Sequence, residues 1–406
     1  MSEQEDLRKE SKNTEGTNKT TGALPRKYNN PVFYGDSSEV TPVGLSDYNE
    51  MVHEKERKQS MKGFDPQYAD FVDYIVKITH QIWEEKGIGI IYQTYHNEVK
   101  MHTGSMTIHG VQEVVSGTLQ TLHAFPDRKL VAENVIWSGN DQDGFFSSHR
   151  VISTATNLGD SSFGSATGKK VAFRTIIDCL VHANRIVEEW LVRDNLYLVK
   201  QLGLDPVEVA KNLAAKTEIK KPALMTHFGL SQTRDGQMEP RTFQQKHKGF
   251  EIGEFAQDLF NKIWEWKLIN RVKDFYAENA VIHYVCDQEL IGHQQIQGMY
   301  ISFFASFPNA GIVIERINCN QGAKTNEWEV SVRWVLHGLH EGFGYFGTPS
   351  GKRIEMLGIS HFSIVDEKVQ EEWVVFDGLD VLRQIHASDE KESVVQPEKY
   401  VDRNET

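Results

Sequence analysis

The sequence predicts an α+β protein that carries one domain pattern twice in tandem. The first observation is a motif, Glu188-Glu189-Trp190, that returns as Glu371-Glu372-Trp373 near the end of the chain. The second is that other residues repeat at the same spacing. The third is the order of elements in each copy, which is two helices followed by a meander of strands. These features predict two similar domains rather than a solenoid of short repeats.

The spacing between the two copies is nearly constant. Phe125-Pro126-Asp127 corresponds to Phe307-Pro308-Asn309, and 307 − 125 is 182. Trp190 and Trp373 are 183 residues apart (373 − 190). Three further pairs with a spacing of 182 or 183 are Gly110 and Gly292, Arg150 and Arg333, and Gly168 and Gly351. A constant offset with one slipped residue is typical of an internal duplication.

The first copy begins with an amphipathic helix. Asp65-Pro66 predicts its start, and apolar residues from Phe71 to Ile82 recur at helical spacing. A second helix is expected between Gly110 and Phe125-Pro126. The strands, separated by turn residues, are expected at 99–103, 129–137, 145–156, 170–180 and 185–194. A bent sheet over helices would leave a conical cavity for a small ligand.

The second copy follows the same order. Its helices are expected at 255–263 and 294–304, and its strands at 281–285, 311–318, 327–339, 352–365 and 368–377. We therefore expect a first domain at 65–212, a linker at 213–250 and a second domain at 251–387. The polar ends of the chain, 1–40 and 388–406, are expected to be disordered tails because they cannot bury enough apolar surface to order themselves.

The composition argues against several classes of protein. The net charge of −13 disfavours a nucleic-acid partner, because no basic patch is available to neutralise phosphates. No apolar run approaches the roughly 18 residues of a membrane span, and residues 1–30 lack the apolar centre of a secretory signal. Cys179, Cys286 and Cys319 show no CxxC spacing. A cytoplasmic location is expected.

These motifs together resemble a known family. In the first copy they are Phe125-Pro126-Asp127, Ser148-His149-Arg150, Thr167-Gly168-Lys169, Glu188-Glu189-Trp190 and Gln201-Leu202-Gly203. In the second they are Phe307-Pro308-Asn309, Arg333-Trp334, Gly351-Lys352 and Glu371-Glu372-Trp373. Both copies resemble the SnoaL-like polyketide cyclases and related ester cyclases of the nuclear transport factor 2-like superfamily. The resemblance implies two cone-shaped domains, packed sheet to sheet as a pseudo-dimer within one chain, and leaves a homo-oligomer open.

One departure from the family pattern bears on the chemistry. In the cyclases that the chain resembles, the acid–base aspartate directly follows the strand tryptophan. Here that position holds Leu191 in the first copy and Val374 in the second, and neither can carry a proton. Acidic residues follow three places later, at Asp194 and Asp377. Because side chains alternate along a strand, these aspartates lie on the other face and do not replace the missing acid.

Four residues are candidates for proton transfer. Asp194 and Asp377 recur in both copies and could exchange a proton at a cavity mouth, or they could cap the short helices that follow. His102 and His283 lie on the short strands that border the cavity by resemblance, and histidine titrates near neutrality. The alternative for each histidine is a structural hydrogen bond.

Seven residues are candidates for substrate binding. Arg150 and Arg333 could hold a carboxylate or an enolate oxygen, or they could pair with Glu188 or Glu371 on the neighbouring strand. The others are Trp190, Trp373, Tyr284, His337 and His361, and the two tryptophans also fit the core. The histidine spacing does not match a metal site, so neither a metal nor another cofactor is expected.

The sequence therefore supports two hypotheses about function. The first is a cofactor-independent cyclase, isomerase or lyase that acts next to the carbonyl of a small molecule, with only one of the two cavities active. In that scheme Asp194 or a histidine moves the proton, and Arg150 or Arg333 stabilises the oxyanion. The second is a small-molecule-binding or scaffolding protein, which the missing acid after each tryptophan favours.

Overall fold

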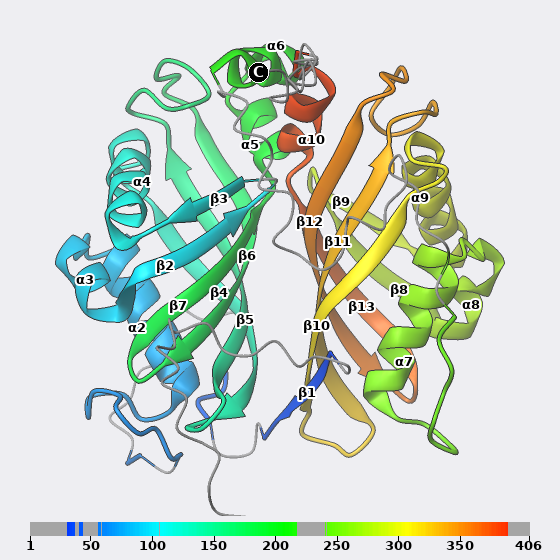
Figure 1. Cartoon of the computed structure of the whole chain (residues 1–406), viewed down its shortest axis with the longest axis horizontal. Helices are drawn as coiled ribbons and strands as arrows, with labels where there is room; N and C mark the ends of the chain where they lie inside the picture. The colour runs from blue at the N-terminus through cyan, green and yellow to red at the C-terminus, as the bar shows by residue number, and fades with distance from the viewer. Residues whose placement is uncertain are drawn as a thin grey trace, which may run out of the picture. The chain divides into compact units, whose positions relative to one another are not determined.

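The computed structural model describes residues 31–36, 40–43, 56–57, 59–104, 106–216, 240 and 242–388. It confirms the α+β fold and its tandem duplication. Each copy has helices on one face of a mainly antiparallel sheet, with α2, α3 and α4 on the first sheet and α7, α8 and α9 on the second (Figure 1). The helices in the described ranges are too short or too polar to span a bilayer.

The first copy contains every element that the sequence predicts. Its helices on the sheet are α2 (Phe71–Trp83), η3 (Ile88–Ile90), α3 (Ile91–Thr94) and α4 (Val111–Ala124). Its strands are β2 (Tyr95–Thr103), β3 (Met106–His109), β4 (Lys129–Asn140), β5 (Gly144–Thr156), β6 (Lys170–His182) and β7 (Arg185–Arg193). Two helices follow, α5 (Asn195–Gln201) and α6 (Pro206–Lys216).

The second copy has the same order. Its helices are α7 (Ile252–Leu259), which continues as the π-helix η5 (Phe260–Glu265), then η6 (Ile269–Arg271), α8 (Val272–Phe275) and α9 (Gly292–Ser306). Its strands are β8 (Tyr276–Tyr284), β9 (Gln288–Ile291), β10 (Gly311–Gln321), β11 (Glu327–Leu339), β12 (Arg353–Val365) and β13 (Lys368–Phe376). Helix α10 (Gly378–Ile385) ends the copy.

The first helix starts later than the sequence predicts. Asp65-Pro66 lies in a turn, and α2 begins at Phe71 because Asp70 is its N-cap, with its carboxylate accepting from the Asp73 N–H. The other Asp70 oxygen accepts from the backbone N–H and the hydroxyl of Thr41. An aspartate in extended conformation is a stronger start signal than a proline four residues earlier, because it satisfies an open N–H of the first turn.

The two sheets share one strand order. It is β3-β2-β7-β6-β5-β4 in the first copy and β9-β8-β13-β12-β11-β10 in the second, where β1 (Val32–Gly35) is added in parallel to β10. The prediction of a disordered tail to residue 40 is therefore wrong for β1, while 1–30 and 389–406 lie outside the described residues. Of the predicted linker at 213–250, the structure describes residues 213–216, 240 and 242–250. Residues 213–216 form the end of α6.

Strand β7 shows how the two faces of each sheet differ. Trp190 and Val192 point to the face away from the helices, where they join a cluster with Phe146, Val335 and Val375 from both copies. The residues between them, such as Leu191, point to the helix-covered face. The apolar contact between the copies thus consists of the outer faces of the two sheets, which confirms the predicted pseudo-dimer.

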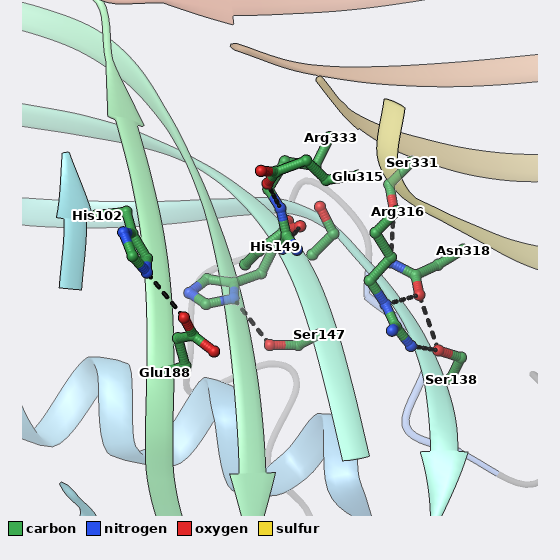
Figure 2. A network of polar contacts seen from close by, with 12 residues as sticks. His102, Ser138, Ser147, His149, Glu188, Glu315, Arg316, Asn318, Ser331 and Arg333 are labelled. Atoms are coloured by element: carbon green, nitrogen blue, oxygen red, sulfur yellow. Dashed lines mark hydrogen bonds and ion pairs between the residues drawn. The ribbon is translucent and has the colours of Figure 1, made fainter. Parts of the chain in front are cut away.

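Polar side chains also connect the two sheets (Figure 2). The Arg316 guanidinium donates to the side-chain Oδ1 of Asn318 on its own strand (2.8 Å) and to the Ser138 hydroxyl of the first copy (2.9 Å). The Ser138 hydroxyl in turn donates to Asn318 (2.8 Å). Because these groups are buried and hydrogen-bonded, they fix how the sheets lie against each other without leaving unsatisfied donors.

Candidate active site

A cavity of about 210 Å³ lies between the helices and the sheet of the first copy. Its apolar lining includes Ile78, Ile82 and Leu191, and the exposed residues Glu113 and Gly117 of α4 lie at its outer rim. Its polar lining includes Tyr95, Thr118, Arg128, His149, Thr175, Glu189, Arg193 and Asn195. A mostly apolar concave space with a few polar groups is the usual form of a small-molecule site.

The strand register places these polar groups in rows. Arg193 lies opposite Thr175, Leu191 opposite Ile177, and Glu189 opposite Cys179. On the next strand, His149 lies opposite Ile177. The floor of the cavity therefore has a basic end at Arg193, an apolar middle and an acidic end at Glu189.

Glu189 is a carboxyl group with little access to water. It is 3 % exposed, and its Oε2 accepts a hydrogen bond of 2.7 Å from the Tyr95 hydroxyl. Burial raises the pKa of Glu189 to about 7, and the hydrogen bond from Tyr95 opposes this rise. A carboxyl whose pKa lies near neutral pH can both release and take up a proton, so Glu189 is suited to acid–base chemistry.

His149 lies in the middle of the same floor. Its side chain is buried, and its Nδ1 is 3.3 Å from the Ser147 hydroxyl (Figure 2). Burial lowers the pKa of His149 to about 4, so the imidazole is neutral near pH 7. A neutral imidazole can donate a hydrogen bond to a developing oxyanion without first having to lose a charge.

The second cone is filled with aromatic rings where the first is open. At the spacing of 181 residues that relates α3 to α8 and β2 to β8, Phe260 replaces Thr79 and Trp264 corresponds to Trp83. Further along, at 182 or 183 residues, the second copy has Tyr300 for Thr118, Trp334 for Val151, Phe362 for Cys179 and Phe376 for Arg193. All six aromatic side chains are buried, and the Trp264 and Trp334 ring centroids are 4.8 Å apart. The second copy has the same fold, but its cone is occupied by its own side chains.

A glycine makes room for the central ring of this filling. Gly358 lies opposite Trp334 on the neighbouring strand, and a β-carbon at Gly358 would be 2.1 Å from the Trp334 ring. Its counterpart in the first copy is Thr175, which lies opposite Val151. The pair of a large and a small residue in one copy thus replaces a pair of medium residues in the other.

The acidic residue is nevertheless present in both cones. Glu372, the counterpart of Glu189, accepts a hydrogen bond of 2.6 Å from the hydroxyl of Tyr276, the counterpart of Tyr95. The Tyr276 and Tyr300 hydroxyls are 3.0 Å apart, so Tyr300 closes the group from the other side. Burial raises the pKa of Glu372 to about 7 as well. The two carboxyls differ in whether a cavity lies beside them.

The two predicted catalytic aspartates act as helix caps, which was the alternative for both. Asp194 accepts from the Tyr197 N–H (3.0 Å) at the start of α5, and Asp377 accepts from the Leu379 N–H (3.0 Å) at the start of α10. Asp377 also accepts from the Asn195 amide. Burial raises the pKa of Asp194 and brings that of Asp377 to about 7. Neither lines the large cavity.

The two predicted catalytic histidines stack on the tryptophans of the neighbouring strands. His102 lies on the Trp190 ring and its Nε2 is 2.8 Å from Glu188 (Figure 2), while His283 lies on Trp373. The pKa of His283 is lowered, mainly by burial. Both histidines alternate with the residues that face the helices, so they lie on the outer faces of their sheets.

The arginines and tryptophans predicted to bind substrate meet between the copies. The Arg150 guanidinium lies 3.6 Å from the Trp373 ring centroid, and Arg333 lies 3.6 Å from that of Trp190. Arg150 pairs with Glu133, whereas Arg333 pairs with Glu315 and with Asp178 of the other copy. The expected partners, Glu188 and Glu371, are not the ones found. These four predicted residues are therefore brought together, but as an interface.

The remaining predicted residues are separated from the cavity as well. His361 lies between the copies, with its Nε2 2.8 Å from the Ser148 hydroxyl, and His337 is buried on the same face of β11 as Arg333. Tyr284 is buried in the second core, and with Asp194 it lines a smaller cavity of about 120 Å³.

One group of side chains has the composition of a metal site. Single ligand atoms of His247, Glu251 and Glu254 lie within 4.8 Å of one another. Each is already used, because Glu254 accepts from the Lys246 N–H and pairs with His247, and Glu251 caps α7. We therefore assign this group a structural role at the start of the helix.

The cone geometry and the duplication agree with a comparison of the sequence with protein-family models. The model of the SnoaL-like polyketide cyclases matches residues 74–202 and again residues 254–385. The chain belongs to the SnoaL-like polyketide cyclase family. Each match covers one cone, so the family resemblance seen in the motifs is confirmed for both copies. Among curated proteins, none matches the sequence.

Three solved structures similar to this SnoaL-like chain each cover about a third of it. A Jannaschia sp. CCS1 protein assigned as a SnoaL-like polyketide cyclase is 21% identical, with 36% of this chain and 100% of that chain aligned and a TM-score of 0.30. TsrD from Streptomyces laurentii is 16% identical over 32% and 94% of the two chains (TM-score 0.29). A Catenulispora acidiphila protein with a ketosteroid isomerase-like fold is 14% identical over 33% and 94% (TM-score 0.28).

Sequence reasoning missed the residues that line the open cone. Glu189 was visible in the repeated Glu-Glu-Trp motif, and since Trp190 faces the other copy, its neighbour Glu189 faces the cavity. Arg193 shares that face, four residues further on. The aromatic residues that replace Val151, Cys179 and Arg193 in the second copy were the signal for which cone is open. That comparison was available from the sequence alignment of the two halves.

Proposed function

We propose that the first cone is a cofactor-independent acid–base enzyme of the cyclase, isomerase or lyase type, and that the second cone is structural. The substrate class is a small carbonyl compound. The observation that carries the proposal is Glu189, a buried carboxyl with a pKa of about 7 that lines an open cavity. Its counterpart Glu372 is enclosed by tyrosines and aromatic rings.

The chemistry follows from what each group can do. The Glu189 carboxylate takes a proton from the carbon next to the carbonyl, and the electron pair of that C–H bond moves to the carbonyl oxygen as an enolate. The neutral His149 imidazole donates a hydrogen bond to this oxygen. Return of the proton from Glu189, to the same or a neighbouring carbon, restores the carboxylate. Tyr95 positions the carboxyl through its hydroxyl.

Glu189 takes over the role that the aspartate after the tryptophan has in the cyclases of the family. That position is Leu191 here, directly between Glu189 and Arg193 on the cavity face of β7. The carboxyl is thus moved by two residues along the strand, about 7 Å, while keeping the same face. This shift also moves the reacting end of the substrate by the same distance along the floor.

The function is tested by proton exchange, which needs no knowledge of the natural product. The protein is mixed in D₂O with a panel of small ketones and 1,3-diketones, and deuterium uptake at the carbon next to the carbonyl is followed by NMR. We expect exchange above the buffer rate for at least one compound. A panel that exchanges only at the buffer rate, although compounds bind in the cavity, would favour the alternative of a binding protein.

Filling the first cone as the second is filled should remove this activity. The variant Val151→Trp with Thr175→Gly copies Trp334 and Gly358. In the second copy the Trp334 indole N–H donates to the Ser360 hydroxyl (3.3 Å), and Ile177→Ser supplies the equivalent acceptor in the first copy. We expect exchange to fall to the buffer rate and thermal stability to be retained, because apolar volume replaces empty space. Retained exchange in the folded triple variant would place the reaction outside this cone.

A further inference from the structure

The basic end of the cavity contains two guanidinium groups in an apolar setting. Arg128 is 5 % exposed, and its Nε and Nη2 donate to the Ser153 hydroxyl (3.1 and 2.8 Å). Its guanidinium lies 4.2 Å from the Trp83 ring centroid. Both guanidiniums lie over the Phe173 ring, 5.7 Å (Arg128) and 5.5 Å (Arg193) from its centroid. Both arginines line the cavity.

Each of these guanidiniums has an N–H donor without a hydrogen-bond partner among the described residues. The Nη1 of Arg128 and the Nε of Arg193 are buried and have no hydrogen-bond partner in the described part of the chain. The same is true of the Thr175 hydroxyl, which lies opposite Arg193 in the strand register. Buried donors without partners are rare, because each costs the free energy of the hydrogen bonds lost to water.

The charge of the two arginines is also left without a close counter-ion. Within the described ranges, neither forms an ion pair with a carboxylate, and each guanidinium is the other's like-charged neighbour. Asp377 is the acidic group that acts on Arg193, but it caps α10 and accepts from Asn195. A buried charge of this kind is costly unless something of opposite charge completes it.

Two other buried arginines, Arg150 and Arg333, have carboxylate partners. Arg150 pairs with Glu133 and Arg333 with Glu315 and Asp178. In the second copy, where the cone is filled, Ala310 stands at the position of Arg128 and Phe376 at that of Arg193. The unpaired guanidiniums therefore occur in the cone that is open and are absent from its counterpart.

We propose that the basic end of the first cone, formed by Arg128, Arg193 and Thr175, binds a carboxylate group of the substrate. This inference rests on the proposed function only in assigning the reacting end of the substrate to Glu189. Binding of a carboxylate at the basic end does not depend on that assignment. Arginine donors match the planar oxygens of a carboxylate. The ligand is thus a carbonyl compound that carries an acid.

The spacing along β7 sets the length of such a ligand. Arg193 and Glu189 are four residues apart, which is roughly 13 Å between α-carbons on an extended strand. Both side chains reach into the space between them, so the carboxylate and the reacting carbon lie several bonds apart. The apolar side chains of Leu191 and Ile177 face the segment that joins the two ends.

The test compares benzoate with its neutral isostere benzamide by calorimetric titration of the full chain. We expect benzoate to bind and benzamide to bind at least tenfold more weakly. Replacement of either arginine, Arg128→Met or Arg193→Met, should weaken benzoate binding by about 10- to 100-fold, since a hydrogen bond to a charged group contributes that much. Lys170→Met, which removes one exposed positive charge on β6, should leave benzoate binding unchanged and serves as the charge control.

Equal binding of benzoate and benzamide, or full benzoate binding by both arginine variants, would overturn the subsite. If a methionine variant does not fold, Thr175→Val, which removes only the unpartnered hydroxyl, is expected to weaken benzoate binding by a smaller factor. Glu189→Gln separates this inference from the proposed function, because it should lose proton exchange and keep benzoate binding. Benzoate binding without any exchange activity supports the subsite and counts against the enzyme.

Discussion

Glutamine in place of Glu189 is expected to lower the rate of proton exchange by about 10²- to 10⁴-fold, the usual contribution of a positioned acid–base group. The change keeps the size of the side chain and its hydrogen bond with Tyr95 while removing the proton that is exchanged. The measurement is deuterium uptake by NMR with the best compound of the ketone panel. Binding of that compound should remain within a few-fold of the parent protein.

The second copy supplies a matched control for this variant. Glu372 is as buried as Glu189, has the same tyrosine partner and has a pKa raised by burial to about 7. Glu372→Gln should therefore have the same effect on stability and none on exchange. Equal loss of exchange in both variants would show that the carboxyl acts through the fold, and not on the substrate.

The pH profile follows from the same pKa. If the Glu189 carboxylate removes the proton, the exchange rate rises as the pH increases through about 7 and then levels off. Tyr95 on β2 and Cys179 on β6 face this carboxyl, and burial keeps the pKa of both well above the ordinary range, so they stay neutral in that window. Glu189→Gln should give a low and flat profile.

The stability of the fold should show the opposite trend with pH. The folded-state pKa of Glu189 lies above its ordinary value of 4.5, so the folded state holds a proton that the unfolded state has released. The free energy of unfolding therefore falls as the pH rises from about 4.5 to about 7. Glu189→Gln removes this loss, and denaturant titrations should find it more stable than the parent protein at pH 8 and similar at pH 4.

Methionine in place of Arg333 is expected to reduce the free energy of unfolding by about 3–5 kcal/mol, because it removes a cation from two buried carboxylates. Arg333 is 2.9 Å from Glu315 on its own sheet and 2.8 Å from Asp178 on the other. The guanidinium also covers the Trp190 ring. Urea titration at neutral pH measures the change, and the loss should shrink at low pH, where the carboxylates take up protons.

Arg150→Met is the control at the equivalent position of the first copy. Its carboxylate partner Glu133 also accepts from Arg174, through both oxygens at 2.8 and 3.0 Å. Glu133 therefore stays neutralised when Arg150 is removed, and we expect a clearly smaller loss than for Arg333→Met. Similar losses for the two variants would contradict the view that Asp178 and Arg333 form the main charge contact between the copies.

The duplication explains how one cone could be filled without losing the fold. The outer faces of both sheets form the contact between the copies, and they contain the arginine–tryptophan pairs in both halves. The inner face of the second cone takes no part in that contact between the copies. Aromatic side chains at those positions bury more apolar surface and stabilise the half that, in our proposal, supports the active cone.

The amino-acid sequence by itself determined the two copies, their order of helices and strands, and the family to which they belong. Those features depend on residue spacing and on the alternation of apolar residues, which are local patterns that can be recognised in the linear sequence. The repeated motif also included Glu189 and Trp190, so the right segment was found. Only the tertiary structure decided which of the two neighbours faces the cavity.

That decision was out of reach because a strand has two buried faces in this fold. Trp190, Arg150 and His361 are buried against the other copy, and Glu189 is buried under the helices, so burial alone cannot separate interface from site. The partners of the arginines also depended on distant strands, since Asp178 reaches Arg333 only when two sheets meet. Contacts of this range are set by the packing of the whole unit, and local sequence patterns do not encode them.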